Sequence, residues 1–438
     1  MSGGGSALPA PHDLALPLAG LILIFAAHLA YGAIRLEATL LTTGLCALLL
    51  LACLAVPGLR RDMLRIGGLT WPAIFFALTL AIGLLSLTPF APGGAHPVWA
   101  YVGQAPGSTT LDPSATIVEL IKLGGLACIF LVGLATGASD ERARWAVNLL
   151  ITLACLFGLW AFFAYATSSI FQTQRGRLEG TLMSPNTAGT FFAALLIVCL
   201  GPLLRRLRGV DARNALQAGA SFTVALLILA ACLMLTASRG AALGAAAGVA
   251  GLVALLFFSG QASWNRATLI LVGGLIAAAG ALYVFGGTLV ERFAALDEGA
   301  AGRGELFAMH WRAFLAAPWS GYGLGAFDTV HRTLIDTHSL EEVWRIRATH
   351  NVYLQWLEEA GVIGAAPMFA CIGAVLLIAT RRAMRRSRMT YVLFALIAAN
   401  LVFLVHGLSD FALQTPSMAM MWAYLLGLQF ALSQGSRR

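Results

Sequence analysis

The sequence is poor in charge. Only 11% of its 438 residues are Asp, Glu, Lys or Arg and 59% are hydrophobic, whereas soluble domains carry about 25% charged residues. The mean hydropathy is +0.81. These values exclude a soluble domain with a single anchor. They predict an all-α polytopic membrane protein, with one integral membrane domain over residues 1–438.

Cysteines are missing from the polar segments, since all seven lie in apolar runs, at Cys46, Cys53, Cys128, Cys155, Cys199, Cys232 and Cys371. A disulfide framework or a thiolate metal site is therefore not expected. Met1–Leu14 has no basic region before its apolar run, so a cleaved signal peptide is not expected either. The net charge of +8 comes mainly from arginines that flank apolar runs. It does not indicate nucleic-acid binding.

Long apolar runs are abundant. A hydrocarbon core of about 30 Å requires about 20 apolar residues per helix. Twelve runs meet this requirement, at approximately 16–34, 38–56, 69–87, 116–136, 145–167, 187–204, 217–236, 241–259, 267–286, 361–380, 391–408 and 416–432.

The arginines predict the orientation of these spans. Alternate connections hold Arg60, Arg61, Arg65, Arg142, Arg144, Arg205, Arg206, Arg208, Arg213, Arg266, Arg381, Arg382, Arg385, Arg386, Arg388, Arg437 and Arg438. By the positive-inside rule this side is the cytoplasm, and an even number of spans puts both termini there. The opposite face of the membrane is then extracytoplasmic.

The opposite side has fewer arginines, at Arg35, Arg175, Arg177, Arg239, Arg292, Arg303, Arg312, Arg332, Arg345 and Arg347. A single one of them can be a helix-end residue that reaches the interface. The whole set works against the topology signal and suggests that some of them hold an anion.

Segment 287–360 is the only long segment predicted outside the membrane. It contains four of the eight histidines, His310, His331, His338 and His350. Gly302–Ala317 mixes polar and apolar residues at helical spacing, which predicts a helix along the membrane surface with Trp311 and Trp319 at headgroup depth and His310 at the interface. The glycines of Pro318–Phe327 predict a tight turn after it rather than a nucleotide loop.

Two positions in this background can carry chemistry. His350 lies where the polar segment re-enters the membrane, and a neutral imidazole there can accept a proton near neutral pH. It can alternatively order the start of the next helix together with Asn351. Glu119 and Lys122 form an ion pair inside a predicted span, which is either functional or a structural link between helices.

Four motifs together resemble the superfamily of O-antigen ligases and O-antigen polymerases (Wzy-C), which are bacterial inner-membrane glycosyltransferases. They are R-L-E-G-T…S-P-N at 177–186, T-A-S-R-G-A at 236–241, G-R-G-E-L-F…P-W-S-G-Y-G-L-G-A-F at 302–327, and A-T-H-N-V-Y-L-Q-W-L-E-E-A-G-V-I-G at 348–364. With the order of spans, the resemblance covers residues 116–432. It implies a fold-type C glycosyltransferase with about 12 transmembrane helices and one large periplasmic loop containing helices.

The resemblance implies an activity. Such enzymes transfer a glycan from an undecaprenyl-diphosphate carrier to an acceptor hydroxyl on a glycan, lipid A-core or protein. The transfer inverts the anomeric carbon and needs no metal or other cofactor. The diphosphate needs cationic partners, and arginine binds phosphate in a bidentate manner.

The site residues expected on this basis are as follows. Arg239 and Arg303 match family positions for the diphosphate, and Arg177 is a further candidate. Lys122 can reach the same charge from inside the bundle, and His350 is expected as the base, with Glu305 as an alternative. Supporting roles are expected for Asn186, Asn351, His406 and Asp410.

Two alternative functions remain open at this stage. A polymerase of lipid-linked repeat units, for O-antigen or exopolysaccharide, would use the same residues. Twelve spans with cytoplasmic termini also describe a transporter or flippase for lipid or polysaccharide. Such proteins commonly have two halves joined by a central connection, and no clear halves are visible here.

Overall fold

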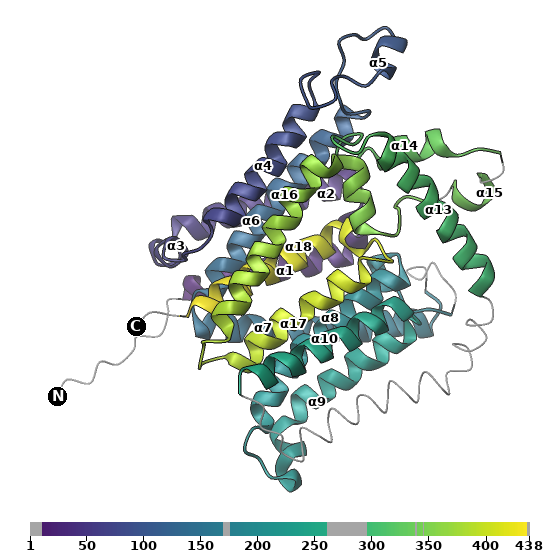
Figure 1. Cartoon of the computed structure of the whole chain (residues 1–438). Coiled ribbons are helices and arrows are strands. Elements are labelled where there is room, and N and C mark those ends of the chain that lie inside the picture. Colours follow the sequence, from purple (N-terminus) through teal and green to yellow (C-terminus); the bar gives the residue numbers. More distant parts are fainter. Residues whose placement is uncertain (1–10, 170–175, 261–295, 338–339, 345, 436–438) are drawn as a thin grey trace.

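The computed structural model describes residues 11–169, 176–260, 296–337, 340–344 and 346–435. These residues form α-helices and short 3-10 helices, and none of the described segments is a strand (Figure 1). The all-α prediction is therefore confirmed for this part of the chain.

Eleven predicted spans coincide with described helices. These are α1 (Pro11–Leu29), α2 (Leu36–Ala55), α4 (Thr70–Ser86), α6 (Pro113–Gly137), α7 (Asp140–Ala166), α8 (Pro185–Leu207), α9 (Ala212–Leu235), α10 (Arg239–Phe258), α16 (Val352–Ala383), α17 (Thr390–His406) and α18 (Pro416–Gln434). The span predicted at 267–286 lies outside the described residues. Seven of the described helices are long and apolar enough to cross a membrane, namely α2, α6, α7, α8, α9, α10 and α16. The number twelve stays a prediction.

The remaining described helices do not coincide with predicted spans. They are α3 (Pro57–Leu64), α5 (Val98–Tyr101), α13 (Leu296–Ala316), α14 (Phe327–Leu334) and α15 (Leu340–Val343), with the 3-10 turns η1 (Tyr31–Ala33), η2 (Gly180–Leu182) and η3 (Ala412–Gln414). Figure 1 shows α13, α14 and α15 together at one side of the bundle, near the end where α16 begins. We call these three helices the α13–α15 unit.

Helix α8 is the centre of the bundle. Its apolar window is buried over its whole length, and it packs against α9, α10 and α17. Phe191 and Phe192 on α8 are fully buried and meet the ring of Phe157 on α7. Because α8 is enclosed on all sides, its first turn is held rigidly where the polar motif 177–186 ends.

Helices α6 and α18 cross at backbone contact. A Cβ on Gly133 would lie 2.3 Å from the carbonyl oxygen of Tyr424, and one on Gly427 would lie 2.0 Å from that of Phe130. Neither position leaves room for a side chain, and the close approach gains dispersion contacts along the crossing.

The arginine-bearing connections meet at one end of the bundle. Arg142 donates to Asp62 at 2.6 Å, Arg386 pairs with Asp140, and Arg382 donates to the carbonyl oxygen of Gly67 at 3.1 Å. These contacts join connections that the sequence predicts on the same side.

Helix α16 is broken at Gly361, whose φ of 60° and ψ of −179° interrupt the helix. The turn 318–325 fills the break. Pro318 and Trp319 accept hydrogen bonds from the amides of Val362 and Ile363 (2.8 and 3.1 Å), while Tyr322 and Gly323 donate to the carbonyls of Glu358 and Glu359 (3.1 and 2.8 Å). The backbone groups freed by the break are thus paired.

The structure corrects one boundary and confirms one turn. The tenth span was predicted to begin at residue 361. Instead, α16 begins at Val352, because the segments before and after Gly361 are both helical. The predicted tight turn is confirmed, since Gly321, Gly323 and Gly325 all have positive φ.

The α6–α18 crossing yields a test of packing. We expect Gly133→Ala to lower stability by about 1–3 kcal/mol, because its methyl group overlaps a backbone carbonyl. Gly124→Ala on the same helix has no atom within 4 Å of the new Cβ and should be neutral or slightly stabilising. Thermal unfolding of the detergent-purified variants compares them; equal midpoints would contradict the close crossing.

Candidate active site at the helix ends

The His-Asn pair lies at the first turn of α16. Asn351 is the N-cap, and its Oδ1 accepts hydrogen bonds from the amides of Tyr353 and Leu354 at 3.1 and 3.0 Å. His350, just before it, has a φ of 55°, an uncommon backbone conformation for a residue with a Cβ. Its half-buried imidazole lies edge-on to Phe411, with 4.8 Å between ring centroids. The sequence predicted Asn351 beside His350 at a helix start, and this local geometry is confirmed.

The first turn of α16 is tied to the end of α17. The amide of Val352 donates to the carbonyl of Gly407 at 2.9 Å, and the Tyr353 hydroxyl donates to the carbonyl of Leu404 at 2.8 Å. These two bonds fix the backbone that carries His350 relative to His406.

His406 is the last residue of α17 and is buried. Its Nδ1 lies 2.7 Å from the Thr190 hydroxyl of α8. A Cβ on Gly240 of α10 would lie 2.5 Å from the imidazole Cδ2, so the imidazole lies directly on the α10 backbone. Asp410 is also buried, and its Oδ2 accepts a hydrogen bond from the amide of Ala412 at 3.1 Å.

Arg177 holds the turn between α9 and α10. Its Nε donates to the carbonyl of Thr236 at 2.9 Å, and its Nη2 donates to Oδ1 of Asn186 at 2.9 Å and to the carbonyl of Ala237 at 3.4 Å. Arg239 follows this turn as the first residue of α10, and its side chain is exposed. A helix N-terminus presents unpaired amides and a partial positive charge, so this position favours anions.

A path of hydrogen bonds links Arg177 to His406. Asn186 accepts from Arg177 through its side chain and from the Thr190 hydroxyl through its carbonyl, at 3.2 Å. Thr190 also bonds His406. The structure therefore brings the ends of α8, α10, α16 and α17 together, and these ends carry Arg177, Asn186, Arg239, His350, Asn351, His406 and Asp410.

Helix α13 carries two more of the predicted residues. Glu305 is exposed, and the side chain of Arg303 lies outside the described atoms. The helix packs against α16. Its predicted amphipathic pattern is confirmed where it is described, since Leu306, Met309 and Ala313 are buried whereas Glu305 and Arg312 are exposed.

His310 on this helix corrects an expectation. It was predicted as an interfacial residue, but it is fully buried against Glu358 and His331. Sequence reasoning missed this cluster, because residues 310, 331 and 358 come together only through the tertiary fold.

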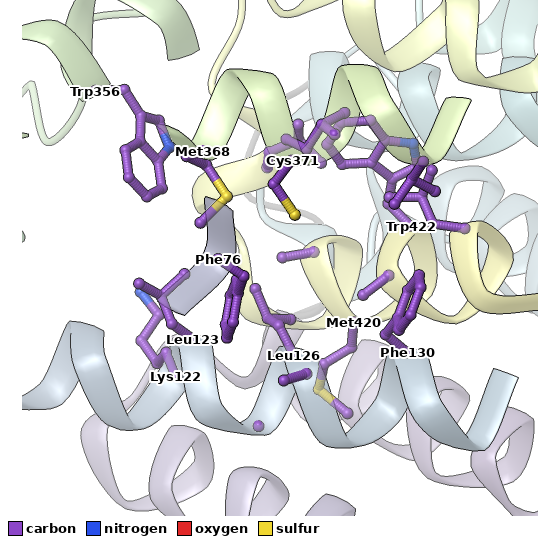
Figure 2. Close-up of a pocket in the computed structure, with 18 of the residues that line it drawn as sticks. Phe76, Lys122, Leu123, Leu126, Phe130, Trp356, Met368, Cys371, Met420 and Trp422 are labelled. Carbon is purple, nitrogen blue, oxygen red and sulfur yellow. The ribbon is translucent and has the colours of Figure 1, made fainter. Parts of the chain in front are cut away.

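Lys122 lies in a different place, in a cavity of about 670 Å³ between α2, α4, α6, α16 and α18 (Figure 2). Its Nζ is 2.5 Å from Oε1 of Glu119, which confirms the predicted pairing. Figure 2 shows mostly apolar walls, with Phe76, Leu126, Phe130, Met368 and Trp422 around the space. Neither Arg177 nor Arg239 is among the lining residues, so the structure does not bring Lys122 together with them.

Glu359 lies at the polar end of this cavity. Its Oε2 accepts from the amide of Gly325 at 2.8 Å, and its Oε1 accepts from Nε2 of Gln355 at 3.0 Å. The cavity also touches Val352, Tyr353 and Gly407, which adjoin His350 and His406 in the sequence. The cavity therefore reaches the first turns of α16.

A comparison with protein families identifies part of the chain. Residues 224–369, about one third of it, match the family model described as O-antigen ligase (Wzy_C), which confirms the resemblance that the motifs predicted for this part of the sequence. The match includes Arg239, the α13–α15 unit and His350. No curated protein matches the chain. The family supports a glycosyltransferase-like membrane enzyme with, in general terms, a lipid-linked glycan and an acceptor as partners.

The N-cap gives a prediction for the site's local order. We expect Asn351→Ala to destabilise the first turn of α16 by about 1 kcal/mol, because the amides of residues 353 and 354 lose their acceptor. Asn351→Asp keeps the acceptor and serves as the matched control. Hydrogen exchange of a peptide covering 352–358 should be faster only in the alanine variant; unchanged exchange would mean that the bonds to α17 alone hold this turn.

Proposed function

We propose that the protein is an inverting, metal-independent glycosyltransferase of the O-antigen ligase type. It moves a glycan from an undecaprenyl-diphosphate carrier to an acceptor hydroxyl at the periplasmic face of the bacterial inner membrane. The observation that carries the proposal is the convergence of the His350 turn and the Arg239 turn at adjoining helix ends, joined through His406.

The diphosphate is the leaving group of the proposed reaction. Its negative charge grows as the bond to the anomeric carbon breaks, so a preorganised cation lowers the barrier. Arg239 meets this need from an exposed position at the N-terminus of α10, where the helix amides add to its positive charge. Arg303 on α13 is the second proposed contact. The bonds of Arg177 to Thr236, Ala237 and Asn186 support a role in positioning the Arg239 turn.

His350 is the proposed base. The acceptor oxygen attacks the anomeric carbon, the carbon–oxygen bond to the diphosphate breaks, and the diphosphate leaves with the electron pair. The hydroxyl proton passes to the imidazole, which must be neutral to accept it. The T-shaped contact with Phe411 and the capped helix start restrict the imidazole to one region. Glu305 is the alternative base, and its exposure on α13 makes it less restrained.

The apolar cavity is the proposed site for part of the polyprenyl chain. Its walls suit a hydrocarbon, and Val352 and Tyr353 at the first turn of α16 are among its lining residues. A chain bound there would bring its diphosphate headgroup to the helix ends. Lys122 is paired with Glu119. In this reading its ammonium neutralises that carboxylate within the cavity rather than binding the diphosphate directly.

The test uses a deletion strain of the source bacterium that expresses each variant at the wild-type membrane level. We expect His350→Ala to reduce glycan transfer by about 10²–10⁴-fold, the usual contribution of a general base. Arg239→Ala should also lose transfer. Arg332→Ala, an exposed arginine paired with Asp328 at 2.6 Å, is the matched control and should transfer normally.

Lipid-linked intermediates decide between the outcomes. Long glycan chains that accumulate on the carrier indicate a missing ligase, whereas single repeat units indicate a missing polymerase. Unchanged surface glycan in His350→Ala together with loss in Glu305→Gln would move the base to Glu305. Accumulation only on the cytoplasmic face would contradict a transferase and indicate a flippase.

A further inference from the structure

Three buried polar side chains lie outside the proposed site, where the α13–α15 unit meets α16. His310 of α13, His331 of α14 and Glu358 of α16 are 0%, 1% and 0% exposed. Nδ1 of His310 is 2.8 Å from Oε2 of Glu358, and its Nε2 is 3.0 Å from Nδ1 of His331. Nε2 of His331 is 2.9 Å from the carbonyl oxygen of Val343. The proposed reaction uses none of them.

The hydrogen-bond partners fix the number of protons. The Val343 carbonyl only accepts, so Nε2 of His331 carries a hydrogen. The contact between the imidazoles needs a second hydrogen, and the contact with the carboxyl group needs a third. Two neutral imidazoles and an ionised carboxylate hold two hydrogens, so the full set of bonds requires one more. With three protons the cluster has no net charge, whichever of the groups holds the shared proton.

Burial favours this neutral state. A net charge of either sign inside protein is costly. Burial lowers the pKa of His310 to about 4 and also lowers the pKa of His331, which resists a fourth proton. The charged or titratable groups that face the cluster are Asp328 and Arg347, with opposite effects on His331, and Tyr322 and Glu359 beside Glu358.

The cluster is the polar part of the joint between α13 and α16. Phe327 stacks on both imidazoles, with centroids at 4.8 Å from His310 and 5.2 Å from His331. Leu306, Met309 and Val343 form a small separate core beside it. This core joins α13 to α15 and is small, so loss of the three hydrogen bonds would loosen α13 from α14 and α15 and remove its buried polar contact with α16.

We propose that His310, His331 and Glu358 are positioning residues. Together they form a clamp that holds three protons and has no net charge. The clamp fixes α13, which carries Arg303 and Glu305, against α16, whose first turn follows His350. The positioning of Arg303 and Glu305 for the reaction rests on the proposed function, whereas the existence of the clamp does not.

The proton count gives the sign of the pH dependence. Suppose that the three groups have ordinary pKa values when the clamp is open. At about pH 6.5 the carboxylate is then ionised and each imidazole is half in its cationic form, so the two imidazoles together hold three protons on average. Above that pH the open state holds fewer protons than the clamp, so raising the pH favours opening. Below that pH the open state holds more protons than the clamp, so lowering the pH also favours opening. Closure is therefore strongest near pH 6.5.

Labelling of a buried cysteine measures the clamp without any glycan. Leu306→Cys places a thiol in the small core, and Leu315→Cys places a reference thiol on the exposed face of the same helix. Each variant is labelled with a membrane-impermeant maleimide, and the rate at position 306 is divided by the rate at position 315. This ratio removes the effect of pH on the reactivity of the thiol itself. In the otherwise wild-type protein we expect the ratio to be low near pH 6.5 and to rise at least tenfold by alkaline pH.

Two substitutions of Glu358 separate proton sharing from simple packing. Glu358→Gln can donate its amide hydrogen to His310 and cannot ionise, so its ratio should stay low at alkaline pH. Glu358→Ala should give a high ratio at every pH. A low ratio in the alanine variant, or an alkaline rise that persists in the glutamine variant, would overturn the clamp.

Glycan transfer tests the positioning role separately. Glu358→Ala should lose transfer and Glu358→Gln should retain it, extending activity to higher pH. Full transfer in an alanine variant whose cysteine is labelled rapidly would overturn the positioning role. If His350→Ala also transfers normally, the proposed function fails, while the labelling result on the clamp stands on its own.

Discussion

The break in α16 at Gly361 is the feature on which the rest of the site depends. A helix that stops hydrogen bonding leaves carbonyls and amides without partners, which is tolerated at membrane depth only where protein supplies them. Here the turn 318–323 supplies them to residues 358, 359, 362 and 363. That turn joins α13 to α14, so the break also anchors the α13–α15 unit. His350 lies at the start of the same helix. The break at Gly361 therefore connects the α13–α15 unit to the helix that carries the candidate site.

The site itself is assembled from helix ends rather than from a loop. The turn before α10 is held by Arg177, the first turn of α16 is held by Asn351 and by α17, and His406 lies between α8 and α10. Helix ends expose backbone amides and fixed partial charges. Rigid helices place these groups more accurately than a mobile loop would, which suits the proposed stabilisation of a separating diphosphate.

Much of this arrangement could be predicted from the sequence, because bilayer thickness sets the length of each apolar run. The His350–Asn351 helix start and the glycine turn after α13 followed from local rules. What could not be predicted is that the helix starting at Val352 and the span from residue 361 form one broken helix, since Gly361 looks like a boundary until the turn that pairs its freed backbone groups is known. The burial of His310 was equally hidden, because its partners lie 21 and 48 residues away.

The neutrality of the proposed clamp fits the chemistry of the proposed site. Two charged groups interact over a long range in a low-dielectric interior. A clamp with a net negative charge would oppose the binding of a diphosphate, and one with a positive charge would compete with Arg239 and Arg303 for it. A cluster that keeps three protons on two imidazoles and a carboxyl group does neither. Two of its hydrogen bonds hold His310 on the helix that carries Arg303, and the third joins His331 to Val343. The positive charge that faces the diphosphate is then supplied by the arginines alone.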